Sequence, residues 1–251
     1  NYRRITMNEQ IAKQLKYLGL KALLAHWDDY LMLAANKRYS HASLLAHIIE
    51  EEFQTKKANA QVLRLKRARI PEPLTLETYP FEQQPKLNKK KIYALYDSST
   101  YLTNHQNLIW LGATGCGKTG LATSFLTHAI SQGYSGRYIL FAEIISELYR
   151  SVADHSAHKV IKDYLNIDCL LIDEIGYVEV EPVQVGLFFT LMHKRHKRKS
   201  TLITSNLGFS DWKSFLKNDH LTAALIDRLT ENSHVINMKQ CVSLRPKLAS
   251  D

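Results

Sequence analysis

The sequence predicts an α/β fold in which helices flank a parallel five-stranded sheet, with a small all-helical domain in front of it. Five short apolar runs alternate with helical segments in the second half of the 251-residue chain, which is the pattern of a parallel sheet. A glycine-rich loop joins the first run to a helical segment. The N-terminal part instead shows helical periodicity alone, and four of the six prolines follow it.

Helical periodicity predicts two helices in the N-terminal part. Apolar residues at helical spacing predict an amphipathic helix over residues 15–34. A second helix is expected to begin near Ser40, a favourable N-cap residue, and to continue through a basic stretch. The clustered prolines end helical structure and indicate a linker. We therefore predict a small helical domain, a proline-rich linker and an α/β domain at residues 1–70, 71–87 and 88–251.

The five apolar runs predict the strands of the sheet. The segments between them have helical character, so helices are expected to connect parallel strands and to cover both faces of the sheet. The predicted strands are residues 108–111, 138–141, 169–172, 201–204 and 234–236.

A glycine-rich sequence directly follows the first predicted strand. Gly-Ala-Thr-Gly-Cys-Gly-Lys-Thr, residues 112–119, matches the P-loop pattern G-x-x-x-x-G-K-[ST] at every fixed position. Glycines let backbone N–H groups point at phosphate oxygens, and the following helix adds its positive N-terminal end. Lys118 would neutralise the β- and γ-phosphates, and the hydroxyl of Thr119 would bind Mg²⁺. The predicted phosphate-binding residues are Gly112, Ala113, Thr114, Gly115, Cys116, Gly117, Lys118, Thr119 and Gly120.

Two acidic residues end the third apolar run. A P-loop needs a carboxylate from an adjacent strand for its metal ion, and Asp173 would supply it. Glu174 would polarise the attacking water as a general base, which favours hydrolysis over nucleotide binding alone. An apolar strand ending in Asp-Glu is common by itself, but the P-loop upstream makes this pair its expected partner.

A polar residue also follows the fourth run. Asn206 would lie beside the phosphate site, where it could orient the attacking water and sense the γ-phosphate. An asparagine that starts a turn before Gly208 explains the same spacing equally well. The N-K-x-D motif of guanine-specific proteins is absent from the sequence, so adenine is favoured.

Taken together, the helical N-terminal part and the runs GATGCGKT, LLIDEIGY, LITSNL and AALIDRL resemble the IstB family, ATP-binding helper proteins of insertion-sequence transposition. DnaC-type helicase loaders of the AAA+ superfamily are the nearest relatives of that family. The resemblance covers residues 15–245. It implies an AAA+ ATPase that uses ATP and Mg²⁺ and forms a homo-oligomer with ATP at subunit interfaces. It also implies that the helical domain grips double-stranded DNA and that the partner is a cognate transposase in the bacterial cytoplasm.

The resemblance implies roles for three further residues. Asn206 matches the family's sensor-1 residue. Arg228 matches the arginine finger that reaches into the ATP site of a neighbouring subunit; without the resemblance we would interpret it as a surface arginine paired with Asp227 or Glu231. Arg245 matches a sensor-2-like arginine that contacts nucleotide, although relatives carry tyrosine where this chain has Leu244. The implied catalytic set is Lys118, Glu174, Asn206 and Arg228.

Basic residues are concentrated in the first part of the chain. Residues 1–107 carry 17 basic and 10 acidic side chains, whereas residues 108–251 carry 16 and 14. Two basic runs without acids are candidates for contacts with DNA phosphates. Each run could instead be a solvated face. The first run contains Lys56, Lys57, Arg64, Lys66, Arg67 and Arg69, and the second contains Lys194, Arg195, Lys197, Arg198 and Lys199.

Composition excludes several classes of protein. With 45% hydrophobic residues, the chain has the composition of a globular protein rather than a disordered one. No apolar run approaches the roughly 18–20 residues that a membrane span needs, so no membrane partner is expected. Three widely spaced cysteines make neither a disulfide framework nor a zinc site, and a reducing cytoplasm is the expected compartment.

These features predict a DNA-binding ATPase that assembles on DNA in an ATP-dependent manner and helps a transposase. Two alternatives share most of the features. A DnaC-like loader would use the same ATP chemistry to deliver a replicative helicase. A nucleotide-switched DNA-binding adaptor would change shape with ATP and hydrolyse little of it.

Overall fold

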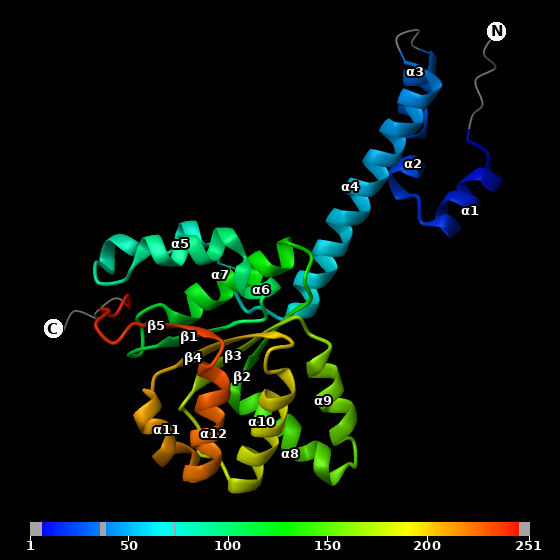
Figure 1. Ribbon diagram of the computed structural model, residues 1–251. Coiled ribbons are helices and arrows are strands. Elements are labelled where there is room, and N and C mark those ends of the chain that lie inside the picture. The colour runs from blue at the N-terminus through cyan, green and yellow to red at the C-terminus, as the bar shows by residue number, and fades with distance from the viewer. Residues whose placement is uncertain (1–6, 36–38, 73, 246–251) are drawn as a thin grey trace, which may run out of the picture. The chain divides into compact units, whose positions relative to one another are not determined.

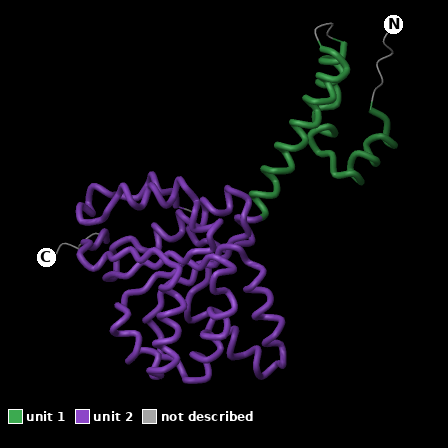
Figure 2. Tube along the Cα trace, viewed as in Figure 1, with its two compact units in different colours: residues 1–63 green, residues 64–251 purple. Residues whose placement is uncertain are grey.

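The computed structural model describes residues 7–35, 39–72 and 74–245 (Figure 1). The chain forms two compact units, residues 1–63 and 64–251 (Figure 2). The division lies inside helix α4, His41–Ala68, and therefore before the boundary at residue 70 that the sequence predicts.

The first unit is helical, with α1 (Glu9–Leu18), α2 (Lys21–Ala25), α3 (Trp27–Ala35) and α4 as far as its residue 63. The single helix predicted over residues 15–34 is wrong. Gly19 ends α1 in the left-handed conformation, with φ 69°, and the chain turns before α2. The second predicted helix is confirmed, and Ser40 precedes it as expected: its hydroxyl accepts a hydrogen bond from the N–H of Ser43 at 3.1 Å.

The first unit buries few side chains. Its buried apolar residues, within the described part of the chain, are Leu15, Ala22 and Tyr30. The carboxylate of Glu52, only 6% exposed, accepts hydrogen bonds from the backbone N–H groups of residues 21–23 at 3.0, 2.8 and 3.2 Å. These N–H groups form the first turn of α2 and have no partners within the helix. Glu52 therefore fastens α2 to α4.

The second unit is built on a parallel five-stranded sheet with helices on both faces (Figure 1). All neighbouring strands are parallel, and their order is β2-β3-β4-β1-β5. The predicted fold class and all five predicted strands are confirmed. The strands are β1 (Asn107–Leu111), β2 (Gly136–Leu140), β3 (Cys169–Ile175), β4 (Ser200–Ser205) and β5 (Ser233–Asn237).

Each face of the sheet has its own hydrophobic cluster, because successive residues of a strand point to opposite faces. Leu108 and Trp110 of β1 belong to one cluster, and Ile109 and Leu111 belong to the other. The first cluster includes α5 (Lys89–Ser98), α6 (Thr100–Thr103) and α7 (Lys118–Ser131). The second includes α8 (Phe141–Ala153), α9 (Ala157–Leu165), α10 (Pro182–Arg195), α11 (Phe209–Leu216) and α12 (Asp219–Thr230).

Residues 71–87, predicted to be a linker, belong to the fold of the second unit. The prolines do exclude α-helix here, and the segment forms only two short 3-10 helices, η1 (Leu76–Thr78) and η2 (Phe81–Gln83). Its apolar side chains are nevertheless buried in the cluster that contains α7, namely Leu76, Tyr79, Phe81 and Leu87. A boundary at residue 88 would remove part of this core.

Across both units, none of the helices in the described ranges combines the length and the apolar character needed to cross a membrane.

Candidate nucleotide site

The P-loop lies between the end of β1 and the start of α7. Gly115 and Gly117 have positive φ angles of 83° and 87°, a backbone conformation in which a residue with a side chain would be strained. Both glycines are also tightly packed. A Cβ on Gly115 would lie 2.6 Å from the hydroxyl of Ser243, and one on Gly117 would lie 2.7 Å from the ring of Tyr79. The fold therefore requires glycine at both positions.

Lys118 begins α7 and is only 8% exposed. Its ammonium group donates to the carbonyls of Gly112 and Ala113, both at 2.8 Å. Burial lowers the pKa of Lys118, while the nearby carboxylates of Asp173 and Glu174 oppose that shift. The lysine thus lies at the base of the loop, where the P-loop pattern requires a cation for phosphate.

Two segments remote in sequence hold the outside of the loop. The hydroxyl of Tyr79 donates to the carbonyl of Cys116 at 2.9 Å. The backbone N–H of Leu244 donates to the carbonyl of Gly115, also at 2.9 Å. The C=O and the N–H of one peptide group point in opposite directions. Because these two donors bind loop carbonyls on the outside, the N–H groups of the same peptides are turned toward the inside, where phosphate would bind. No motif in the sequence predicted Tyr79, because it lies in the segment that we interpreted as a linker.

Asp173 lies on β3 and is 1% exposed. Its carboxylate accepts hydrogen bonds from three hydroxyls: Thr119 at 3.1 Å to each oxygen, Tyr138 at 2.9 Å, and Thr204. Burial and the neighbouring Asp173 raise the pKa of Tyr138, so this hydroxyl keeps its proton and donates. The sequence predicted that Thr119 and Asp173 share a metal site, and it predicted no site role for Tyr138 or Thr204.

The donor set of Asp173 and Thr119 fits a magnesium ion. Carboxylate and hydroxyl oxygens suit Mg²⁺, which is commonly bound by one or two protein groups together with substrate phosphates and water. Within the described residues, histidine, cysteine, aspartate and glutamate form no cluster of three or more that could hold a metal ion by themselves. The structure therefore favours a metal shared with a nucleotide over a metal held by protein ligands alone.

Glu174 differs from its neighbour in backbone and in exposure. Its φ of 64° is in the left-handed region, which is uncommon for residues other than glycine and costs energy. The register between β3 and β4 shifts between Ile172 and Ile175, so a bulge contains the acidic pair. The N–H of Glu174 donates to the hydroxyl of Thr204 at 3.0 Å. The bulge leaves the Glu174 side chain exposed at a cavity above the P-loop.

This cavity has a volume of about 260 Å³ and brings most of the predicted site together. Its wall includes the predicted Lys118, Glu174, Asn206 and Arg245. Asp173 lies beneath the wall, hydrogen-bonded to Thr119. The complete lining is Thr114, Gly115, Gly117, Lys118, Thr119, Glu174, Tyr177, Thr204, Asn206, Leu244 and Arg245. Of these, Tyr177, Thr204 and Leu244 were not predicted to be site residues. The hydroxyl of Tyr177 lies 2.7 Å from that of Thr114.

Asn206 follows β4 and reaches the cavity wall. Its amide oxygen is buried and has no hydrogen-bond partner within the described chain. Gly176 approaches this oxygen so closely that a Cβ there would lie 2.3 Å away. A buried acceptor at a cavity wall is available to a ligand or a water molecule. A sensor role requires such an acceptor beside the phosphate site, and that role stays a prediction.

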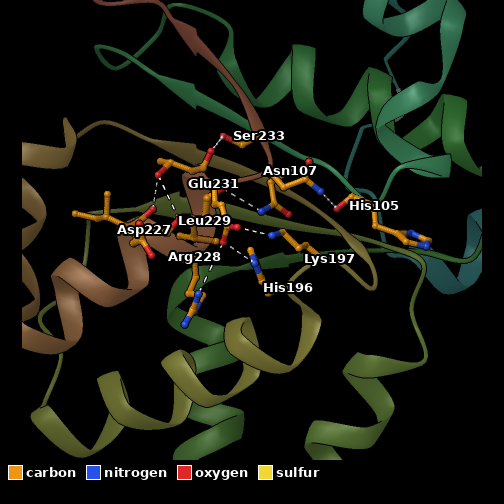
Figure 3. A network of polar contacts seen from close by, with 12 residues as sticks. His105, Asn107, His196, Lys197, Asp227, Arg228, Leu229, Glu231 and Ser233 are labelled. Carbon is orange, nitrogen blue, oxygen red and sulfur yellow. Dashed lines mark hydrogen bonds and ion pairs between the residues drawn. The ribbon is translucent and has the colours of Figure 1, made fainter.

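Arg228 does not line this cavity. It lies near the end of α12 with 40% of its side chain exposed, and its guanidinium is 3.8 Å from the carboxylate of Glu231 (Figure 3). The same carboxylate also pairs with His196 and Lys197. The surface ion pair considered from the sequence is therefore present. An exposed arginine outside its own cavity is also what an arginine finger for a neighbouring subunit requires.

Arg195 of α10, predicted to contact DNA, is 1% exposed. That prediction is wrong because the guanidinium is enclosed in the domain, where burial lowers the pKa of Arg195 to about 10. The side chain instead joins the end of α9 to the start of β4. It donates to the carbonyls of Tyr164 (2.6 Å), Ile167 (2.9 Å) and Ser200 (2.6 Å) and to the hydroxyl of Thr201 (3.1 Å).

The other predicted DNA-contacting residues differ in exposure. In the second run, Lys197 pairs with Glu231 and Lys199 pairs with Asp168, whereas Lys194 and Arg198 are exposed. In the first run, Arg64 is half-buried and the rest are exposed, namely Lys56, Lys57, Lys66, Arg67 and Arg69. The first run is therefore the stronger candidate for contacts with DNA.

Comparison with known proteins identifies relatives of the whole chain. Residues 13–250 match the family model described as IstB-like ATP binding protein. A protein of insertion sequence IS232 from Bacillus thuringiensis subsp. berliner, named for ATP binding, is 29% identical over 230 residues, 92% of each chain. The fold is similar to the crystal structure of DnaI (TM-score 0.55, 17% identity, 65% of this chain and 90% of that one). It is also similar to the DnaC helicase loader (TM-score 0.50, 22% identity, 61% and 92%).

Proposed function

The chain belongs to the family of IstB-like ATP-binding proteins, and from this we propose that it is a DNA-binding ATPase that assembles on DNA with ATP and helps a transposase. The observation that carries the ATPase proposal is that Lys118, Glu174 and Asn206 line one cavity, with Asp173 beneath it. The transposition context is supported by a relative from an insertion sequence that matches over 92% of both chains.

Six residues at the cavity wall or beneath it have a part in the proposed hydrolysis. Lys118 would exchange its two carbonyl contacts for oxygens of the β- and γ-phosphates. Glu174 would take a proton from the attacking water, and the Asn206 amide would orient that water. A magnesium ion held by Asp173 and Thr119 would neutralise charge on the phosphates. Arg245, at the same wall, would contact the phosphates from the side of the C-terminal tail.

The position of Glu174 favours an ATPase over an adaptor that only binds ATP. A residue in the left-handed region persists only where its surroundings impose that conformation. Here the bulge in β3 and the hydrogen bond to Thr204 impose it, and they leave the carboxylate at the cavity. Strained residues cluster at functional sites, which is consistent with a general base at this position.

The ATPase proposal is tested by phosphate release from the purified protein with Mg-ATP and duplex DNA. Glu174→Gln should reduce the rate by roughly 10²–10⁴-fold, the usual contribution of a general base, and should leave ATP binding intact. Glu179→Gln is the matched control, because Glu179 is exposed, pairs with Lys217 and does not line the cavity. A wild-type protein without turnover on any DNA would overturn the proposal in favour of the adaptor.

A helicase loader is the second candidate, because the fold is also that of DnaC and DnaI. These similarities are below 25% identity and concern the fold alone, whereas the family match spans residues 13–250. Direct binding distinguishes the two proposals. The purified protein should bind the transposase of its own insertion sequence and should not bind the replicative helicase. The reverse result would replace the transposition proposal with the loader.

A further inference from the structure

Arg245 reaches the nucleotide cavity on a tail without helix or strand. The tail, residues 238–245, follows β5. Without a repeating backbone ladder, such a segment is ordered only by its contacts with the rest of the fold. One contact is the N–H of Leu244 on the carbonyl of Gly115, which attaches the tail to the P-loop next to Arg245.

A second contact holds the tail two residues before Leu244, where the side chain of Gln84 binds the backbone of Val242. Its Nε2 donates to the carbonyl of Val242 at 2.7 Å, and its Oε1 accepts from the N–H of the same residue at 2.9 Å. A side-chain amide offers one donor and one acceptor side by side, as a neighbouring β-strand does. Gln84 is 1% exposed and directly follows η2, in a segment anchored by the buried Phe81 and Leu87. The amide is therefore held on a fixed support.

We propose that Gln84 is a positioning residue for Arg245: its double hydrogen bond to Val242 orders the tail so that Arg245 lines the nucleotide cavity. The proposal rests on the proposed function, because it assumes that Arg245 binds nucleotide. It extends the site to residues 71–87, which carry none of the nucleotide-binding motifs. Gln84 and Val242 are 158 positions apart in sequence, so only the fold brings them together.

The effect of the Gln84 contact is preorganisation of the tail. Without it, residues 242–245 would have to become ordered each time a nucleotide binds, and this ordering would weaken binding. The P-loop itself would keep the hydrogen bond between the Tyr79 hydroxyl and the Cys116 carbonyl. A substitution of Gln84 should therefore weaken ATP binding only when Arg245 is present. In a protein that already lacks Arg245, it should have no further effect on affinity.

A double-mutant cycle tests this coupling in the full-length protein. Gln84→Met, which keeps most of the side-chain volume, should weaken Mg-ATP binding roughly tenfold, as expected for the loss of two neutral hydrogen bonds. Arg245→Ala should weaken binding at least as much, and the double variant should bind no more weakly than Arg245→Ala alone. Gln83→Met is the matched control, because Gln83 is the exposed neighbour of Gln84. Amide hydrogen exchange at residues 241–245 should be faster in Gln84→Met than in wild type.

Gln84→Leu is the second variant if Gln84→Met does not fold, since leucine fills a buried site with a smaller apolar side chain and removes both the donor and the acceptor. Equal ATP affinity of wild type and the Gln84 variants would overturn the inference. Losses that multiply in the double variant would also overturn it, because Gln84 would then support the fold independently of Arg245. Either result leaves the proposed function standing if wild type binds and hydrolyses ATP. A wild type that does not bind ATP would overturn both.

Discussion

Thr204 connects the two acidic residues of the site through one hydroxyl group. The hydroxyl donates to the carboxylate of Asp173 and accepts from the backbone N–H of Glu174. It is 1% exposed on β4, so water does not replace it easily. The position of the proposed metal ligand and the backbone of the proposed base are therefore set by the same side chain.

Thr204→Val should uncouple hydrolysis from nucleotide binding. Valine has the same shape but leaves the N–H of Glu174 without its acceptor, which typically costs about 1–3 kcal/mol for a buried group. If this cost is borne by the transition state, the hydrolysis rate should fall by roughly 5- to 150-fold, whereas the dissociation constant for ATP should change little. Steady-state phosphate release and equilibrium ATP binding measure the two quantities.

Two further variants separate this role from a general loss of stability. Thr204→Ser keeps the hydroxyl and should retain most of the rate. Thr201→Val removes another buried hydroxyl of β4, the one that accepts from Arg195, and should lower the unfolding temperature without selectively slowing hydrolysis. Equal rate losses in Thr201→Val and Thr204→Val would remove the special role of Thr204.

The roles of residues that belong to a recognisable motif could be predicted from the sequence. The roles of residues outside any motif could not. Lys118 was predicted from the P-loop pattern, Glu174 from the acidic end of an apolar run, and Asn206 from the end of the next run together with the family resemblance. The structure places all three around one cavity. Tyr79 and Gln84 contact the same region through groups that many surface residues also carry. Their roles depend on which backbone carbonyl or N–H lies nearby, and a sequence does not contain that information.

At the scale of elements, the short apolar runs predicted all five strands, most clearly the central strands β1, β3 and β4, which are buried on both faces. Helical periodicity was less reliable. It failed over residues 15–34, where the apolar spacing continues but Gly19 ends the helix in a left-handed conformation. It also failed over residues 71–87, where prolines exclude α-helix without excluding burial. A basic run in the sequence also does not show which of its side chains are exposed. On helix α10, one position of such a run faces the core, and Arg195 occupies it.

The basic end of α4 and the residue that follows it give the element-scale prediction. Lys66, Arg67 and Arg69 are exposed, and we propose that they contact DNA phosphates. Each phosphate contact contributes about 0.9 to the slope of log affinity against log salt concentration, so replacing all three with glutamine should reduce that slope by roughly 2.7. Affinity should fall for all DNA sequences alike. Binding titrations at several salt concentrations measure the slope.

The control for this experiment removes the same charge elsewhere. Lys159, Lys162 and Lys213 are exposed on α9 and α11, and their replacement with glutamine should leave the slope nearly unchanged. If both triple variants reduce the slope equally, DNA responds only to the net charge of +9, and α4 is not a specific contact surface.

At the scale of the whole molecule, the proposed function requires more than one copy of the chain. The cavity contains Lys118, Glu174 and Asn206 but not Arg228, which is partly exposed elsewhere on the same unit. If Arg228 acts on a neighbouring subunit, each ATP site takes its base and its arginine from different copies. The ion pair with Glu231 does not oppose this, since exposed pairs contribute little to stability.

Mixing two inactive variants tests that division. Arg228→Ala should reduce turnover by roughly 10³–10⁵-fold if the residue is an arginine finger, and Glu174→Gln should be inactive as well. In randomly mixed oligomers about a quarter of the interfaces pair an intact Glu174 with an intact Arg228, so phosphate release should return to about that fraction. Arg150→Ala, which changes an exposed arginine outside the proposed sites, should remain active alone. Mixtures that stay inactive although both variants bind ATP and assemble would place Arg228 outside the ATP site.

The contacts on the outside of the P-loop determine which shortened fragments of the protein would keep an intact nucleotide site. A fragment that starts at residue 88 would contain every recognisable nucleotide-binding motif. It would nevertheless lose the hydroxyl that holds Cys116 and the amide that holds Val242. A fragment that ends at β5 would keep both of those groups and lose Arg245. The smallest independent ATP-binding fragment of this chain is therefore defined by the buried contacts of its two ends, and its limits lie well outside the motifs.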